Sequence, residues 1–209
     1  MKVLIINGSP RAEGNCAQLI DELVKTFSDE NVEVEVINVA NNPVKGCLAC
    51  GYCHTHEGCV QNDLVNPTNE KLKNSDGLIF VSPVYFGSPN GSLISFLDRL
   101  FYSCPHDLKM KVGASFVVAR RAGTTASFDV LNKYFLIRGM PVVSGDYWNN
   151  GFGREKGEIQ EDLEGLRNAR VVARRMVFLM KAIQDNKEKY SDLLIDEKRV
   201  ATHFIKNNK

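Results

Sequence analysis

Short apolar runs recur along this sequence, and a stretch with helical periodicity follows most of them. The first run, Val3 to Ile6, is apolar at every position and ends at Asn7-Gly8. Such a run leaves neither face polar, so it predicts a strand covered on both faces in a parallel sheet. The apolar residues after Asn15 recur at helical spacing, which predicts an amphipathic helix packed on that sheet. They are Ala17, Leu19, Ile20, Leu23, Val24 and Phe27.

The same alternation continues through the rest of the chain. Further strands are predicted at 32–39, 77–81, 112–119 and 141–143, and further helices over 93–101, 128–137 and 163–183. Strands that alternate with helices form an α/β fold, here a three-layer α/β/α sandwich around a parallel sheet. Five strands in one small domain favour the flavodoxin-like order 2-1-3-4-5, in which ligands bind beyond the carboxyl ends of strands one and three.

Composition narrows the class of protein further. The 209 residues carry 26 Lys and Arg against 25 Asp and Glu, a net charge of +1, so no strong field attracts nucleic acid. The apolar runs are too short to span a membrane, and no signal-peptide pattern follows Met1, so we expect a cytoplasmic protein. We expect one domain over 1–185, with a cysteine-rich loop inserted at 41–65, and a polar tail over 186–209 that packs on a partner subunit.

The loop after the first strand runs from Asn7 to Cys16 and leads directly into the first helix. A helix start presents free backbone N–H groups and the positive end of the helix dipole, which together hold a phosphate. Ser9 and Asn15 add neutral donors and Arg11 adds a cationic fork. The loop lacks both the P-loop ending and the dinucleotide glycine spacing, so it suits a mononucleotide phosphate. The alternative is a plain Asn-Gly turn in which Asn15 caps the helix.

The loop after the third strand, Ser82 to Asn90, combines prolines and a glycine with the adjacent aromatics Tyr85 and Phe86. Such a stiff loop suits a flat heterocycle, or else it packs under the next helix or against another subunit. Trp148 and its neighbours follow the fifth predicted strand, near the same rim. Core packing is one interpretation of these aromatic side chains.

Four cysteines, Cys47, Cys50, Cys53 and Cys59, lie in one compact loop. Thiolates at this spacing can bind a [4Fe-4S] cluster, although five residues rather than three precede the last cysteine and no proline follows it. Zinc with His54 or His56, a redox-active thiol pair, and a loop without metal are the alternatives. Cys104 is predicted to be a small buried residue on the inward face of its helix. Asp98 and Arg99 are predicted to lie on a solvated helix face, with a subunit contact as the alternative.

Two of these loops resemble one known family. The Gly-Ser-Pro-Arg opening and Pro83-Val84-Tyr85-Phe86-Gly87 are similar to the phosphate and flavin-ring loops of NADPH-dependent FMN reductases, a family that includes the iron-sulfur flavoproteins. The resemblance extends from Met1 to about residue 182. It also implies that Trp148 and its neighbours form an acceptor wall beside the flavin, which is the alternative to core packing. It implies that the FMN phosphate is held by Ser9, Arg11, Asn15 and Cys16, where many relatives have Thr in place of Cys16. It implies that the ring and ribityl chain are held by Pro83, Val84, Tyr85, Phe86 and Gly87. A third loop, with Arg120, Arg121, Ala122 and Gly123, completes the implied site, although Thr124 and Thr125 replace the Gly that often follows.

The resemblance implies an FMN-dependent oxidoreductase that accepts electrons from NADH or NADPH. The acceptor is a small quinone, azo compound or flavin, or a [4Fe-4S] cluster held by the cysteine loop. The flavin carries the chemistry, so no side chain is assigned as catalytic. We expect a homodimer or homotetramer, because the exposed ring loop needs cover. The alternatives are an FMN-binding electron carrier that serves protein partners, and a flavin-binding regulatory module.

Overall fold

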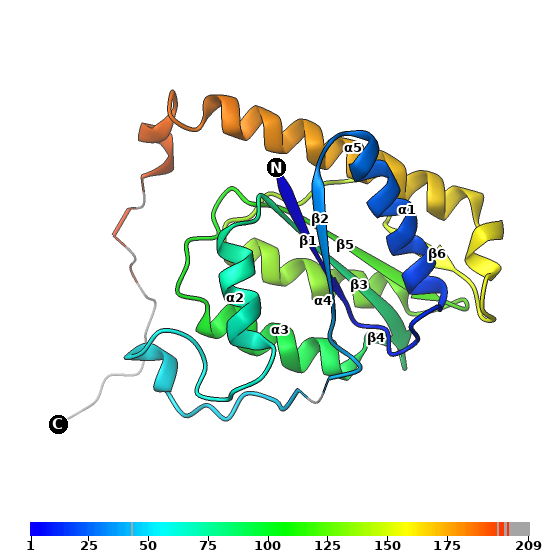
Figure 1. Ribbon diagram of the computed structural model, residues 1–209, viewed down its shortest axis with the longest axis horizontal. Helices are drawn as coiled ribbons and strands as arrows, with labels where there is room; N and C mark the ends of the chain where they lie inside the picture. The colour runs from blue at the N-terminus through cyan, green and yellow to red at the C-terminus, as the bar shows by residue number, and fades with distance from the viewer. Residues whose placement is uncertain (43, 196, 199, 201–209) are drawn as a thin grey trace.

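The computed structural model describes residues 1–42, 44–195, 197–198 and 200. Strands and helices alternate from the first residues to the long final helix (Figure 1). The strands are β1 (Lys2–Asn7), β2 (Glu33–Asn38), β3 (Gly77–Tyr85), β4 (Ser88–Pro89), β5 (Val112–Ala119) and β6 (Asn150–Phe152). The α-helices are α1 (Asn15–Asp29), α2 (Val65–Lys73), α3 (Gly91–Ser103), α4 (Thr124–Ile137) and α5 (Leu163–Asn186). Short 3-10 turns lie at Tyr52–His54, Glu158–Glu161 and Ser191–Leu194.

The central sheet has the order β2-β1-β3-β5-β6, and all of these strands are parallel. In order of occurrence along the chain this is 2-1-3-4-5, so the predicted flavodoxin-like arrangement is confirmed. The short β4 lies off this path and pairs antiparallel with the end of β3. Because the strands of the main sheet are parallel and are connected by helical crossovers, they all end at the same edge. The loops after β1, β3 and β5 meet at that edge.

Two apolar cores lie on the two faces of the sheet. Val3 and Ile5 of β1 pack with α1 and α5, whereas Leu4 and Ile6 pack with α2, α3 and α4. Figure 1 shows α1 and α5 together on one side of the strands. Side chains alternate between faces along a strand, so a strand between two helical layers needs apolar residues throughout. This is the physical origin of the unbroken apolar runs.

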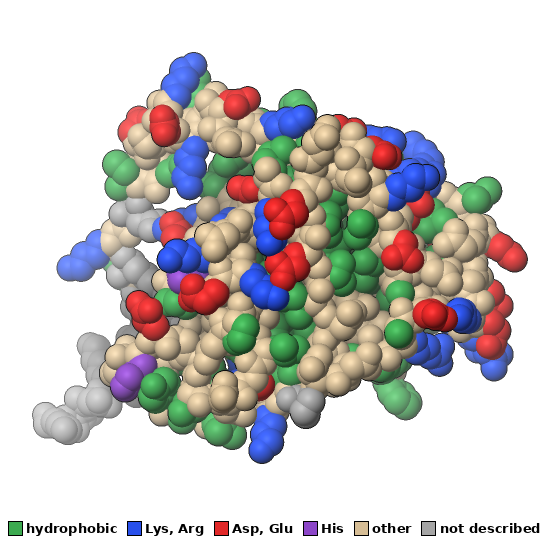
Figure 2. Space-filling model, in the orientation of Figure 1, with side chains coloured by type: hydrophobic (Ala, Val, Ile, Leu, Met, Phe, Trp, Pro, Cys, Tyr) green, Lys and Arg blue, Asp and Glu red, His purple; other side chains and the backbone are tan. Residues whose placement is uncertain are grey.

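The edge strand β2 is polar on part of its surface. Glu35 on β2 accepts ion pairs from Lys2 on β1, at 2.8 Å, and from Lys71 on α2, at 2.5 Å. Charged side chains on an edge strand discourage pairing with another sheet. Charges of both signs are interspersed over the face drawn in Figure 2, in keeping with the net charge of +1.

The fifth strand was predicted in the wrong place. Residues 141–143 contribute an isolated bridge between Gly113 and Val142, and the fifth strand is β6. The intervening segment leaves the sheet because α5 holds it: Arg175 donates to the carbonyl of Ser144 and to Asp146, and Asn168 accepts from the backbone N–H of Asp146. The helix α2 was not predicted, because its sequence is polar and carries Pro67 in the first turn.

The end of the chain continues beyond α5 as a short 3-10 turn. The expected tail over 186–209 lies partly outside the described residues, which omit 196, 199 and 201–209. Across the described part of the chain, no helix is long and apolar enough to cross a membrane.

Candidate functional site

A pocket lies at the sheet edge where β1, β3 and β5 end. It is lined by Ser9, Arg11, Asn15, Cys16, Pro83, Val84, Tyr85, Val118, Arg120, Gly153 and Arg154. Eight of these belong to the predicted site, so residues from all three predicted loops meet around one space. The remaining predicted residues, Phe86, Gly87, Arg121, Ala122 and Gly123, lie in the same loops but not on this lining.

The first loop is fixed by short-range hydrogen bonds. The N–H of Gly8 donates to the carbonyl of Val81 at 2.8 Å, which joins this loop to β3. The N–H of Ser9 donates to Asn7 Oδ1 at 2.9 Å, and the N–H of Arg11 to Ser9 Oγ at 3.3 Å. Ser9 is buried, whereas Arg11 is exposed at the mouth of the pocket. The loop is therefore preformed, with its cationic side chain available.

The start of α1 lacks the cap that a plain turn would supply. Gly14 occupies the N-cap position, and no side chain of the described residues caps the helix. The first N–H groups of a helix have no partners within it, so an uncapped start retains donors for an anion. The interpretation of Asn15 as the helix cap is therefore wrong.

Asn15 instead joins α1 to the loop after β6. Its Nδ2 donates to the carbonyl of Glu155 at 3.0 Å, and its Oδ1 accepts from the N–H groups of Gly157 and Ile159, at 3.2 and 3.4 Å. These contacts bring Gly153 and Arg154 to the pocket. Sequence reasoning missed both, because the signal that marks them is the end of the fifth strand, which had been placed too early.

Cys16 lies buried where the first loop joins α1. Burial raises the pKa of its thiol to about 12, and the hydrogen bond with Ser9 and the charge of Arg11 offset only part of that effect. The side chain therefore stays a protonated thiol at neutral pH, a weak donor and not a nucleophile.

The second loop is a tight hairpin. β4 returns along β3 through a two-residue turn of Phe86 and Gly87, with φ values of +51° and +76°. Positive φ at both central residues is the feature of a type I′ turn. The Phe86 side chain is fully exposed, and Tyr85 is exposed beside the pocket. The hairpin thus presents two aromatic side chains at the rim.

The third loop packs tightly against the hairpin. Gly123 has a φ of +89°, and a Cβ added to it would lie 2.8 Å from the Cα of Gly87 and 2.9 Å from Val84 Cγ1. Only glycine fits such an approach without displacement of its neighbours.

The Tyr147 and Trp148 rings meet edge to face at a centroid distance of 4.6 Å, and Trp148 is 49% exposed. The core-packing interpretation of Trp148 is therefore wrong.

A second pocket is lined mainly by the cysteine loop. Its lining includes all four predicted ligands, Cys47, Cys50, Cys53 and Cys59, together with Arg99, Tyr102 and Ser103 of α3. All four are free thiols. The chain turns sharply here, with positive φ at Ala49 and Gly51. The N–H of Ala49 donates to the sulfur of Cys47 at 3.4 Å.

Asn66, near the start of α2, fixes the last of the four cysteines. Its Oδ1 accepts from the N–H of Cys59 at 2.7 Å, and its Nδ2 donates to the carbonyl of Cys59 at 2.8 Å. Gly58 precedes this clamp with a φ of +80°, and an added Cβ would lie 2.7 Å from Asn66 Oδ1. The Asn66 side chain thus fixes the position of Cys59 by holding both of its backbone polar groups.

The four thiols are close enough to influence one another but are not gathered around one ion. Burial raises the pKa of Cys53, a backbone hydrogen bond offsets part of that rise, and the sulfurs of the other three cysteines raise the pKa further. Among the described residues, no three His, Cys, Asp or Glu side chains stand close enough to share one metal ion. His54 is bonded to Tyr102 at 2.8 Å and His56 stacks on Tyr52, so neither supports the zinc interpretation.

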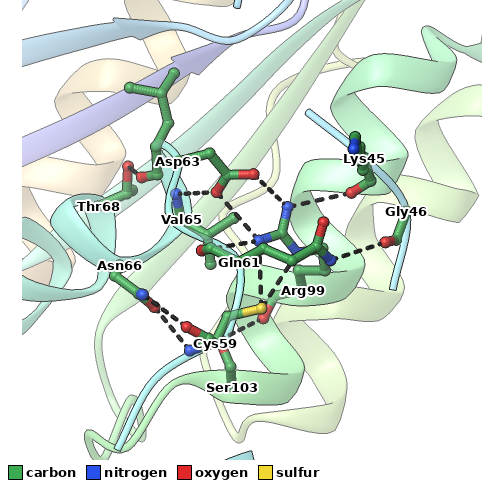
Figure 3. Close-up of polar contacts among 11 residues, drawn as sticks. Lys45, Gly46, Cys59, Gln61, Asp63, Val65, Asn66, Thr68, Arg99 and Ser103 are labelled. Atoms are coloured by element: carbon green, nitrogen blue, oxygen red, sulfur yellow. Dashed lines mark hydrogen bonds and ion pairs between the residues drawn. The ribbon is translucent and has the colours of Figure 1, made fainter. Parts of the chain in front are cut away.

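Arg99 corrects another prediction. It was expected on a solvated helix face, but its side chain is only 1% exposed and points into the cysteine loop (Figure 3). Its neighbour Asp98 is exposed, as predicted, and its carboxylate accepts a hydrogen bond from the Tyr134 hydroxyl at 2.5 Å. Cys104, as predicted, is buried.

The fold and the pocket at the sheet edge together define a flavodoxin-like α/β protein in which a preformed loop before α1 and an aromatic hairpin border one space. The chain belongs to the NADPH-dependent FMN reductase family, whose model matches residues 1–155. It is similar to an iron-sulfur flavoprotein of Methanocaldococcus jannaschii, with 33% identity over 88% of this chain and 100% of that protein. An iron-sulfur flavoprotein of Methanosarcina thermophila is 31% identical over 90% of this chain and 100% of its own length.

Solved structures confirm the fold. An NAD(P)H:quinone oxidoreductase from Methanothermobacter marburgensis superposes with a TM-score of 0.67 at 16% identity, over 84% of this chain and 96% of that one. The predicted family is therefore confirmed, and the chain is an FMN-dependent oxidoreductase.

Proposed function

We propose that this protein passes electrons from NADH or NADPH through bound FMN to a [4Fe-4S] cluster in the cysteine loop, and from there to a small acceptor of the quinone, azo or flavin type. One observation carries the proposal: the four cysteines of the cysteine loop are free thiols that line one pocket. The same chain has a second pocket that suits FMN. The relatives named iron-sulfur flavoproteins support the same assignment.

In the flavin site, the residues bind and orient the cofactor. The uncapped start of α1, with Ser9 and Arg11, offers donors and a positive charge to the phosphate. Pro83, Val84 and the exposed Tyr85 border the place of the ring, and Arg120 approaches from the third loop. FMN, when bound, accepts electrons in pairs and releases them in pairs or singly.

In the cysteine loop, the chain supplies four sulfur ligands and a surrounding of donors. Cys59 accepts N–H groups from the Arg99 guanidinium, and Cys47 accepts one from the backbone. Sulfur in a neutral thiol is a weak acceptor, whereas a thiolate bound to iron is a stronger one. The donors therefore suit a metal-bound thiolate better than an empty thiol loop.

The test is anaerobic purification followed by iron and flavin analysis of two variants. Cys50→Ser should lose iron and keep FMN, because the flavin loops belong to other segments. Cys104→Ser is the matched control: Cys104 directly follows α3, is not on the lining of the cysteine pocket, and its sulfur contacts the carbonyl of His106, so this variant should keep its iron. Wild-type protein with full FMN and no iron after reconstitution would refute the cluster.

A turnover assay distinguishes the reductase from an electron carrier. With excess NADPH and a quinone, a reductase oxidises many equivalents of NADPH per flavin, whereas a carrier stops after about one. A single turnover with every acceptor tested would show that the electron-carrier alternative is correct.

A further inference from the structure

Arg99 is a charged side chain in the interior, one turn before the end of α3. With 1% of its side chain exposed, it is the largest fully buried residue of the described chain. An isolated buried guanidinium is strongly unfavourable, so its surroundings must satisfy both its charge and its N–H donors.

The guanidinium reaches both ends of the cysteine loop (Figure 3). Nη1 donates to the carbonyl of Lys45 at 3.1 Å, before Cys47, and Nη2 to the carbonyl of Gln61 at 3.4 Å, after Cys59. Both Nη atoms bind the Asp63 carboxylate, at 2.5 and 3.1 Å. These contacts balance the charge and close the loop.

Two further contacts have a different acceptor. Nε and Nη2 donate to the sulfur of Cys59 at 3.4 and 3.2 Å. The arginine fork thus directs two polarised N–H groups at one proposed iron ligand, and Asp63 sets how much of the positive charge remains uncompensated there. Hydrogen bonds to cysteine sulfur and local net charge are both factors that set the reduction potential of an iron-sulfur cluster.

We propose that Arg99 is a positioning residue that raises the reduction potential of the cluster through Cys59, and that Asp63 lowers it by balancing the Arg99 charge. The inference rests on the proposed function, since it requires a cluster on Cys59. Its physical basis is that the reduced cluster carries one more negative charge than the oxidised one. N–H donors and positive charge beside the sulfur stabilise that reduced state, and a carboxylate destabilises it.

The experiment is a redox titration of the anaerobic holoprotein, in which the EPR signal of the reduced cluster is measured at each potential. In Arg99→Gln, the ratio of reduced to oxidised cluster at a fixed potential should fall about tenfold, which for one electron is a decrease of about 59 mV. Arg99→Lys keeps the charge without the fork, so it should fall between Gln and wild type. Asp63→Asn should shift the ratio in the opposite direction.

Arg138→Lys is the matched control. Arg138 also donates to carbonyls, those of Phe101 in α3 and His106 just after it, but among the described residues it has no hydrogen bond with the four cysteines. This variant should lose stability and keep the wild-type potential.

Opposite shifts in Arg99→Gln and Asp63→Asn support the inference, because a purely structural role would not separate them in sign. Iron-loaded variants with the wild-type potential refute it while the proposed function stands. Where Arg99→Gln fails to retain iron, the sign of the Asp63→Asn shift decides alone. Wild-type protein that binds no iron refutes both the inference and the cluster.

Discussion

Replacement of Gly123 by alanine tests how closely the third loop packs on the aromatic hairpin formed by β3 and β4. The Cβ would lie 2.8 Å from the Cα of Gly87 and 2.9 Å from Val84 Cγ1, both part of the hairpin. The residue also has a φ of +89°, a conformation unfavourable for alanine. Both effects destabilise the folded state, and the first also displaces residues at the pocket.

Alanine substitutions at other glycines separate the cost of the backbone conformation from the cost of the close contact. A left-handed conformation costs about 1–2 kcal/mol in a non-glycine residue. Overpacking against atoms that cannot move freely costs about 1–3 kcal/mol more. Gly123→Ala should therefore lower the free energy of unfolding by about 2–5 kcal/mol. Gly87→Ala has a φ of +76° and no described atom within 4 Å of the new Cβ, so it should lose the conformational part alone.

Gly91→Ala provides a control of opposite sign. Gly91 is the first residue of α3, and its added Cβ meets open space. There alanine should be neutral or should stabilise the protein by up to about 1 kcal/mol. Urea denaturation gives the three free energies, and fluorescence titration gives the FMN affinity, which should fall most in Gly123→Ala. Equal losses in Gly123→Ala and Gly87→Ala would refute the close approach of the two loops.

Three further predictions concern the same protein. Arg11→Ala should weaken FMN binding about tenfold or more, because it removes a charge-assisted contact of about 1.5–3 kcal/mol; an unchanged fluorescence titration would exclude this role. Since burial raises the pKa of Cys16 from 9.0 to about 12, the unfolded thiol loses its proton first, and stability should fall as pH rises above 9. Cys16→Ser should flatten that decline, by at most about 1.4 kcal/mol per pH unit, in urea denaturation from pH 8 to 11. Light scattering at micromolar concentration should show a homodimer or homotetramer, since Phe86 is fully exposed, and a monomer would contradict this.

The sequence was informative wherever the signal is local. The unbroken apolar run in β1 predicted a strand between two helical layers, because alternate side chains must be buried on opposite faces. The spacing of apolar residues predicted α1 and α5, and the order of elements predicted the sheet. Since parallel strands end at one edge, the meeting of the first three loops followed as well.

Errors arose where the local signal was weak. The segment 141–143 has the composition of a strand, yet the strand lies at Asn150–Phe152, because contacts from Arg175 and Asn168 remove the intervening residues from the sheet. That shift concealed Gly153 and Arg154. The polar helix α2 was missed because its stability comes from packing on α3, not from its own sequence.

The sequence by itself determined the fold and the identity of the four cysteine thiols, because hydrophobic period and residue spacing are properties of short segments. Tertiary structure alone decided what surrounds those thiols. Arg99 and Cys59 lie 40 positions apart, and nothing in the local pattern distinguishes a buried arginine from a solvated one. A buried charge is defined by the partners that balance it, and Asp63 and Cys59 become partners only when the loop closes on α3.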